Sequence, residues 1–279
     1  MQLFALLTLK EEGAQPAREV VAAFLGRRIG VTRTREWLDR FEHHLKAFES
    51  RKGAASKGGD VEAGGMKRTA LRSTKVLRAC AELNRDLQVA DKALVFLRVV
   101  EFEKALLKES GLDAVELDEI SMEFVVTVAD SFGISKSERD CYLGLVLRSV
   151  DWSEYTGRFD EAFTITPDVN FPGIHRTNWP ENTACFLHPT SQIVFVRAAE
   201  HTDIELNGEL LTDGRVMPFA PGSVLRHPSC TPVFFGDIRR HFLEEEETLH
   251  VELKVEDVSH WFNYPNNQAL HPMNCSAFS

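Results

Sequence analysis

The chain has 279 residues, of which 43% are hydrophobic and 27% charged, and its formal net charge is −10 at pH 7. This charge disfavours general nucleic-acid binding, because such binding relies on Lys and Arg to neutralise phosphates. No apolar run reaches the roughly 18 to 20 residues that cross a bilayer. The apolar start at residues 3–7 is followed by Lys10, Glu11 and Glu12 rather than by a cleavage site, so we expect it to form a helix of the mature protein.

The five cysteines are odd in number, widely spaced and never arranged as Cys-x-x-Cys. This pattern argues against a disulfide framework and against a zinc site. We therefore expect a reducing, cytoplasmic location.

Helical spacing of apolar residues dominates residues 1–150. Trp37, Phe41, Leu45 and Phe48 follow one helix face, and the most apolar segment, 89–107, predicts a central helix. Residues 51–65 contain five glycines and no large apolar side chain, which predicts a flexible loop between two helical groups.

Two helix ends can be located from their capping residues. A helix is expected to begin at Asp118 or Ser121 and to stop at Gly133, because glycine favours the left-handed conformation that ends helices. Ser135 and Glu138 form a Ser-x-x-Glu capping box. The helix that follows is expected to carry Leu143, Val146 and Leu147.

After residue 150 the pattern changes to short strands separated by Pro, Gly, Asn and Asp. The predicted strands lie at 184–187, 192–196, 203–206, 216–219, 232–235 and 250–255. Asn207-Gly208 predicts a two-residue type I′ hairpin, in which both turn residues need a positive φ, and Asp213-Gly214 gives a second such signal. These features predict a compact antiparallel β-sandwich over 160–243.

Motifs for catalysis are largely absent: the sequence lacks a Gly-x-x-x-x-Gly-Lys phosphate loop, Gly-x-Gly-x-x-Gly, His-Glu-x-x-His and Gly-x-Ser-x-Gly. His43 and His44 point about 100° apart on a helix, which is poor geometry for one metal ion. The acidic run at 244–247 is interpreted as a solvated loop.

One short stretch contains three residues that could bind a phosphate group. Ser223, Arg226 and His227 offer charge-assisted hydrogen bonds to a phosphate group. The alternative interpretation, which we favour, is a turn followed by an exposed strand.

The string from Asp118 to Ser135 resembles the TerB-like helical domain, with an acid-rich helix start, a buried stripe and a Phe-Gly-Ile-Ser cap. Residues 3–25 look like an earlier helical pair of the same fold. The resemblance implies an all-α bundle over 1–150. It also leaves open a metal-linked stress-response protein that uses acids such as Glu11, Glu12 and Asp118.

Residues 204–211, 214–216 and 220–226 together are similar to the end of forkhead-associated (FHA-like) sandwiches. Phosphothreonine-binding members place Gly-Arg and Ser-x-x-His motifs before the Asn-Gly turn, and this chain lacks both upstream. The resemblance therefore implies a structural FHA-like module. A free-standing module that binds phosphopeptides or proteins through Ser223, Arg226 and His227 is the alternative.

Residues 249–262 and 269–278 look like the opening strands of an ATP-binding cassette (ABC) ATPase domain. This resemblance implies that Phe262 occupies the position of the A-loop aromatic that stacks on adenine, with Trp261 and Tyr264 as nearby alternatives. The Gly-rich Walker A loop would be expected where the sequence stops. As the alternative, the three aromatics are core residues of a last β-hairpin.

The order of these segments resembles the cytoplasmic N-terminal half of certain bacterial ABC transporter ATP-binding proteins. It implies an all-α bundle at 1–150, an antiparallel sandwich at 160–243 and a truncated ATPase start at 249–279. Such a region is regulatory and not catalytic by itself, since Walker A is absent. ATP would bind only in the full-length protein, at the cytoplasmic face of the inner membrane. The partners would be its own downstream ATPase and membrane domains, with a homodimer formed through the ATPase.

Overall fold

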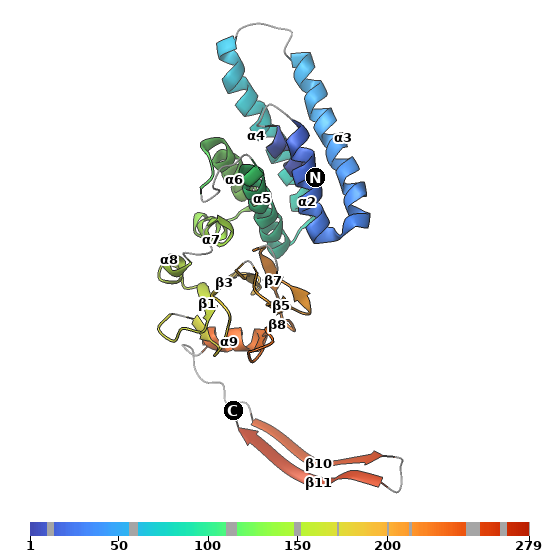
Figure 1. Ribbon diagram of the computed structural model, residues 1–279, viewed down its shortest axis with the longest axis vertical. Helices are drawn as coiled ribbons and strands as arrows, with labels where there is room; N and C mark the ends of the chain where they lie inside the picture. The colour runs from blue at the N-terminus through green and yellow to red at the C-terminus, as the bar shows by residue number, and fades with distance from the viewer. Residues whose placement is uncertain are drawn as a thin grey trace. The chain divides into compact units, whose positions relative to one another are not determined.

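The structure is a computed structural model that describes residues 1–9, 14–55, 61–109, 116–147, 152–171, 173–199, 201–211, 214–243, 252–262 and 267–278. It contains two compact units, Met1–Phe235 and Gly236–Ser279. In the first unit a group of helices is followed by two β-sheets (Figure 1). Helices in the first part of the chain and strands after them agree with the predicted layout.

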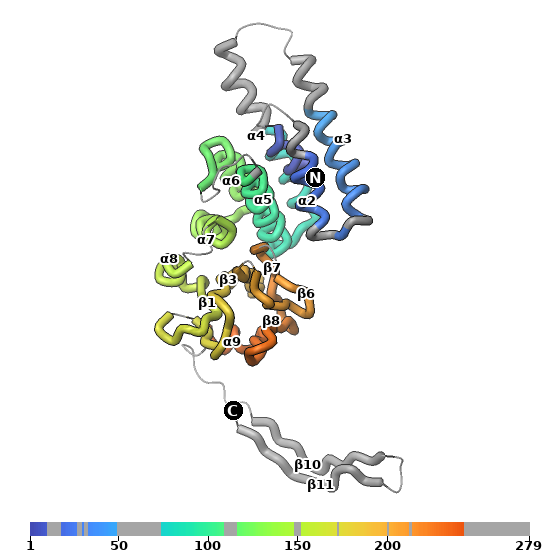
Figure 2. The backbone as a smooth tube through the Cα atoms, viewed as in Figure 1, coloured from blue at the N-terminus to red at the C-terminus, as the bar shows by residue number. Residues whose placement is uncertain are grey.

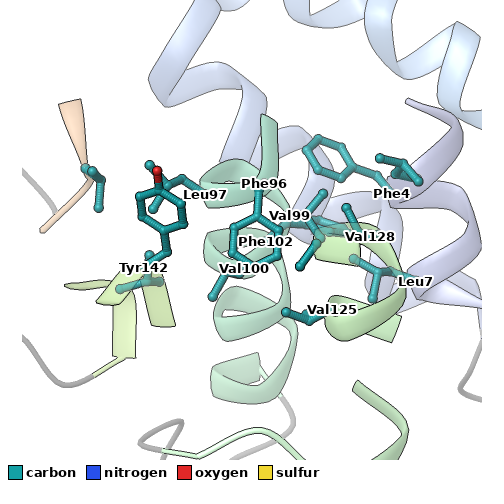
Figure 3. Close-up of a cluster of buried hydrophobic side chains, with 14 of the residues drawn as sticks. Phe4, Leu7, Phe96, Leu97, Val99, Val100, Phe102, Val125, Val128 and Tyr142 are labelled. Atoms are coloured by element: carbon teal, nitrogen blue, oxygen red, sulfur yellow. The ribbon is translucent and has the colours of Figure 1, made fainter. Parts of the chain in front are cut away.

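The helical part contains α1 (Gln2–Thr8), α2 (Ala14–Ile29), α3 (Val31–Ala55), α4 (Val61–Asp86), α5 (Val89–Glu109), α6 (Glu119–Phe132) and α7 (Lys136–Leu147). The predicted central helix at 89–107 is confirmed as α5. Its buried side chains include Phe96, Leu97, Val99, Val100 and Phe102. Figure 3 shows α5 in the middle of the buried cluster, between residues of α1 and α6 on one side and Tyr142 of α7 on the other. None of the described helices is both long enough and apolar enough to cross a membrane.

The predicted loop over 51–65 is wrong at both ends. Helix α3 continues to Ala55 and α4 begins at Val61. Residues 56–60 lie outside the described part of the chain. Alanine, lysine, arginine and glutamate in these stretches favour helix, and each glycine opposes it by only about 1 kcal/mol.

The predicted caps are confirmed. The Asp118 carboxylate accepts a hydrogen bond from the Ser121 backbone N–H at 2.7 Å, and Gly133 ends α6 with φ 72°. At α7, the Ser135 N–H donates to Glu138 at 2.9 Å, and the Glu138 N–H donates to the Ser135 hydroxyl at 3.2 Å. The reciprocal pair is the predicted capping box.

The first sheet has the order β2-β1-β3-β4-β7 and the second has the order β6-β5-β8-β9. The first comprises β1 (Ala162–Thr166), β2 (Gly173–His175), β3 (Thr183–Leu187), β4 (Val194–Arg197) and β7 (Met217–Phe219). The second comprises β5 (Glu205–Leu206), β6 (Glu209–Leu210), β8 (Val224–Arg226) and β9 (Val233–Phe234). The short helix α8 (Ser153–Thr156) precedes β1, and the backbone can be followed through α8 into the sheets in Figure 2.

The expectation of a purely antiparallel sandwich is wrong at one strand pair. Strands β1 and β2 are parallel, so the first sheet is mixed. The pairing depends on Gly173, whose φ is 142° and where a Cβ would lie 2.0 Å from the Thr164 carbonyl oxygen. Only glycine fits this close approach without strain.

The predicted Asn-Gly hairpin is confirmed between β5 and β6. Asn207 has φ 54° and Gly208 has φ 84°, the two positive values that a type I′ turn requires. The second predicted turn includes Asp213, which lies outside the described residues.

The helices and the first sheet share one hydrophobic core. Ala184, Phe186 and Phe195 belong to the same buried cluster as Phe96 and Tyr142. Because alternate residues of a strand face opposite sides, β3 and β4 use one face for this cluster. The predicted domain limits at 1–150 and 160–243 remain predictions, and the structure adds that Met1–Phe235 is one compact unit.

The second unit contains two long strands, β10 (Glu252–Phe262) and β11 (Asn267–Phe278), which pair antiparallel. Glu252 is opposite Phe278 and Phe262 is opposite Asn267. Helix α9 (Phe235–Leu243) begins at the last residue of the first unit.

Candidate functional site

Helix α7 lies between the helical core and the first sheet. The Tyr142 ring makes edge-on contacts with Phe186 at 5.3 Å and with Phe195 at 5.7 Å between ring centroids, and it packs against Phe96 of α5 at 5.9 Å. Burial raises the pKa of the Tyr142 phenol. Tyr142 therefore joins α5, α7 and the sheet in one aromatic cluster.

The C-terminal end of α7 is held by two cationic side chains from other elements. The Arg197 guanidinium of β4 donates to the carbonyl oxygens of Leu145, at 2.7 Å, and of Val146. Lys104 of α5 donates to the Val146 carbonyl at 2.8 Å. Carbonyls in the last turn of a helix have no partner within the helix and carry partial negative charge. Arg197 and Lys104 supply both the missing hydrogen-bond donors and a positive charge beside these carbonyls.

A buried histidine lies beside the N-terminal end of α7. His188, directly after β3, is 2% exposed, and its Nε2 lies 3.7 Å from the Glu138 carboxylate of the capping box. The Ser191 backbone N–H donates to His188 Nδ1 at 3.2 Å, which assigns the proton of the neutral ring to Nε2, facing Glu138. Burial lowers the pKa of His188, and Glu138 opposes that shift.

A third polar contact joins α5 to the residue before β7. The buried Glu101 carboxylate accepts from Arg98 at 2.7 Å and from the Val216 backbone N–H at 2.7 Å. We call the contacts of Arg197, Lys104, His188, Glu101 and Tyr142 the α7 joint. Because Arg197 and Glu101 are buried and hydrogen-bonded, removing the partner of either side chain should destabilise far more than the same change at the surface.

The sequence alone did not single out the α7 joint. The predicted packing residues of this helix were Leu143, Val146 and Leu147, whereas Leu143 and Leu147 are only half-buried and Tyr142 and Leu145 are fully buried. The one signal in the sequence is Arg197, a charged residue that ends the apolar run of β4.

In the structure, each of the three residues predicted to bind phosphate has contacts with other residues. Asn207 donates to the Ser223 hydroxyl at 3.2 Å and accepts from the Val224 N–H at 2.9 Å, so Ser223 supports the hairpin turn. Leu225 of β8 is fully buried and Arg226 is exposed opposite Glu205 of β5. The alternation along β8 therefore directs Arg226 to the outer face of the second sheet.

His227 has local contacts of its own. Its Nδ1 accepts from the Ser229 N–H at 3.3 Å and lies 3.3 Å from the Cys230 sulfur. The Cys230 sulfur also lies 2.7 Å from the Asn178 carbonyl oxygen. Burial raises the pKa of Cys230, which favours the thiol over the reactive thiolate.

Three cysteines have buried thiols that burial keeps protonated and unreactive. Cys80, Cys141 and Cys185 are free and buried. Burial raises the pKa of Cys80 to about 11 and that of Cys141 to about 12, and it raises the pKa of Cys185 further. Cys275 lies in β11, whose side chains are outside the described part of the structure.

Acidic side chains meet at the start of α6. The Ser121 hydroxyl lies 2.5 Å from the Glu103 carboxylate and 2.6 Å from the Asp118 carboxylate. Glu11 and Glu12, named with Asp118 for the metal alternative, lie outside the described residues. In the part of the chain that is described, no three His, Cys, Asp or Glu side chains are grouped to hold a metal ion.

Two of the aromatics predicted for the nucleotide position, Trp261 and Phe262, are the last residues of β10. In the β10–β11 register, Trp261 is opposite Gln268 and Phe262 is opposite Asn267. Tyr264 lies outside the described residues.

Comparison with known proteins gives no relative: no protein-family model, no curated protein and no solved structure matches this chain.

Proposed function

We propose that this chain is the regulatory, non-catalytic N-terminal region of an ABC-type transporter ATP-binding protein, and that the α7 joint couples its helical part to its sheets. The observation that carries the regulatory role is that α7 contacts other elements at both ends. At its C-terminal end Arg197 of β4 and Lys104 of α5 donate hydrogen bonds to its carbonyls, and at its N-terminal end His188 lies 3.7 Å from Glu138. A displacement of α7 would therefore disturb contacts with both the helical core and the sheet.

The resemblance to an ATPase start is supported by the form of the C-terminal segment. Residues 252–262 and 267–278 form two long paired strands, as opening strands of a larger domain would. In the full-length protein, ATP would be held with the help of Phe262, Trp261 and Tyr264. We assign no step of ATP chemistry to the described residues, and ATP would supply the energy for transport elsewhere in that protein.

A photolabelling experiment tests this assignment on the native protein, isolated with an antibody against residues 160–240. We expect 8-azido-ATP to label a peptide within 252–278. Phe262→Ala should reduce the labelling and Phe262→Tyr should retain it, because both aromatic rings can stack on adenine. Phe234→Ala, at an exposed aromatic of β9, is the matched control. Absence of labelling in the native protein would overturn the proposal.

The regulatory role is tested by measuring the rate of ATP hydrolysis in the same preparation. If the α7 joint couples the two parts, Arg197→Met should change the rate of ATP hydrolysis by the native protein. Arg226→Met changes an exposed arginine of β8 and should leave the rate at the parent value. Equal rates for both variants and the parent would contradict the coupling role.

A further inference from the structure

A pocket of about 290 Å³ lies on the side of α7 that the sheet does not cover. Asp140, Leu143, Gly144 and Leu147 form one wall. Their spacing of i, i+3, i+4 and i+7 is that of a single helix face. The pocket therefore touches the same helix that the α7 joint contacts at both ends.

Two other elements complete the pocket. Leu117 and Met122, at the start of α6, add apolar surface, and Tyr155 and Arg158 come from α8 and the residue pair after it. Tyr155 approaches α7 closely, because a Cβ on Gly144 would lie 2.2 Å from its ring. The absence of a side chain at Gly144 is what lets Tyr155 form this wall.

The lining combines an apolar interior with charges of both signs. Leu117, Met122, Leu143 and Leu147 are apolar, Glu116 and Asp140 are acidic and Arg158 is basic. The Arg158 guanidinium stacks over Phe159 at 5.0 Å, and within the described part of the chain it forms no ion pair. The Asp140 carboxylate makes one weak ion pair, in which its Oδ1 lies 3.9 Å from Nε of Arg139. Arg158 and Asp140 are therefore available to a ligand.

We propose that this pocket binds a small zwitterion with an apolar body, namely a free amino acid with an apolar side chain. The Arg158 guanidinium matches a carboxylate and the Asp140 carboxylate matches an ammonium group. Leu143, Leu147 and Met122 supply the apolar surface for the side chain. A volume of about 290 Å³ lies at the lower end for ligand pockets and suits one such molecule.

The position of the pocket gives the ligand two connections to the first sheet. Tyr155 stacks on Trp152 at 4.9 Å with the rings 11° from parallel, and the Trp152 indole N–H donates to the Phe163 carbonyl of β1 at 3.0 Å. The second connection runs through α7 to Arg197 and His188. A role for the ligand as an effector rests on the proposed regulatory function, whereas its binding does not.

Binding is tested on the whole chain by calorimetry and by the change in tryptophan fluorescence that the parent shows and Trp152→Phe lacks, with L-leucine, L-methionine and L-phenylalanine as probes. We expect saturable binding of at least one, and a rise in the melting temperature with ligand concentration. Leucinamide lacks the carboxylate and 4-methylpentanoate lacks the ammonium group. Each should bind about tenfold or more weakly than leucine, because one charge-assisted contact is lost.

Three variants locate the site. Arg158→Gln should weaken leucine binding about tenfold or more, and Met122→Trp should block it by filling the pocket. Arg226→Gln should bind leucine as the parent does. No binding of any of the three amino acids, unchanged binding by both pocket variants, or equal binding of leucine and leucinamide would each overturn the proposal. ATP photolabelling of the native protein is independent of these results, so failure of this site and failure of the proposed function are distinguishable.

Discussion

Arg197→Met is the sharpest test of the α7 joint, because methionine keeps much of the apolar stem and removes the guanidinium. Arg197 is 6% exposed and donates to two carbonyls at the end of α7. Lys104 still reaches the Val146 carbonyl, so the change leaves the Leu145 carbonyl as the main loss. A hydrogen bond from a charged group contributes about 1.5–3 kcal/mol, and we expect the free energy of unfolding to fall by that amount.

Urea denaturation of the whole chain, followed by circular dichroism, measures this loss. With a slope of about 2–3 kcal/mol/M, the midpoint should move down by about 1 M. Arg226→Met, an exposed arginine on β8, should change the free energy of unfolding by less than about 0.5 kcal/mol. If Arg197→Met were as stable as Arg226→Met, the two hydrogen bonds would not support the joint as argued.

Three further perturbations have defined outcomes. Folding lowers the pKa of His188 from its ordinary value of 6.5, so the unfolded state binds the proton more tightly than the folded state does. The neutral His188 ring therefore contributes its full stabilisation above pH 6.5, and this stabilisation is lost as the pH falls below 6.5. Urea midpoints at pH 7.5 and 5.5 should therefore differ less in His188→Gln than in the parent, and an equal difference would contradict this account. Gly144→Ala places a Cβ 2.2 Å from Tyr155, and should destabilise by about 1–3 kcal/mol. Calorimetric melting should show that adding Tyr155→Ala to Gly144→Ala destabilises less than the sum of the single changes, whereas strict additivity would refute the clash. Gly173→Ala should destabilise by more than about 2 kcal/mol, because its Cβ meets the Thr164 carbonyl at 2.0 Å; a parent-like urea midpoint would show that β2 does not need glycine.

Local signals in the sequence located the helix caps and the hairpin turn. Asp118, Gly133, the Ser135–Glu138 box and Asn207-Gly208 act within a few residues, so their geometry is set by neighbouring backbone groups. The loop predicted over 51–65 is wrong at its ends, because Gly53 in α3 and Gly64 and Gly65 in α4 did not outweigh the helix-forming residues around them.

Contacts between segments far apart in the sequence could not be predicted from such local signals. The parallel pairing of β1 and β2 depends on Gly173 meeting Thr164, and no local pattern encodes such a pairing. Arg197 meets Leu145 across 52 positions, and Glu101 meets Val216 across 115. Hydrophobic periodicity identifies which side chains are buried in general, but not which element covers them. The α7 joint and the pocket beside it therefore emerge only from the tertiary structure.

The central claim, that this chain is the front region of a transporter ATPase, is tested most directly by the intact mass of the native protein. An antibody against residues 160–240 would detect it in separated membrane and soluble fractions. The account predicts a species far heavier than 31.5 kDa, the mass of the 279-residue chain, in the membrane fraction. A species of 31.5 kDa confined to the soluble fraction would contradict it.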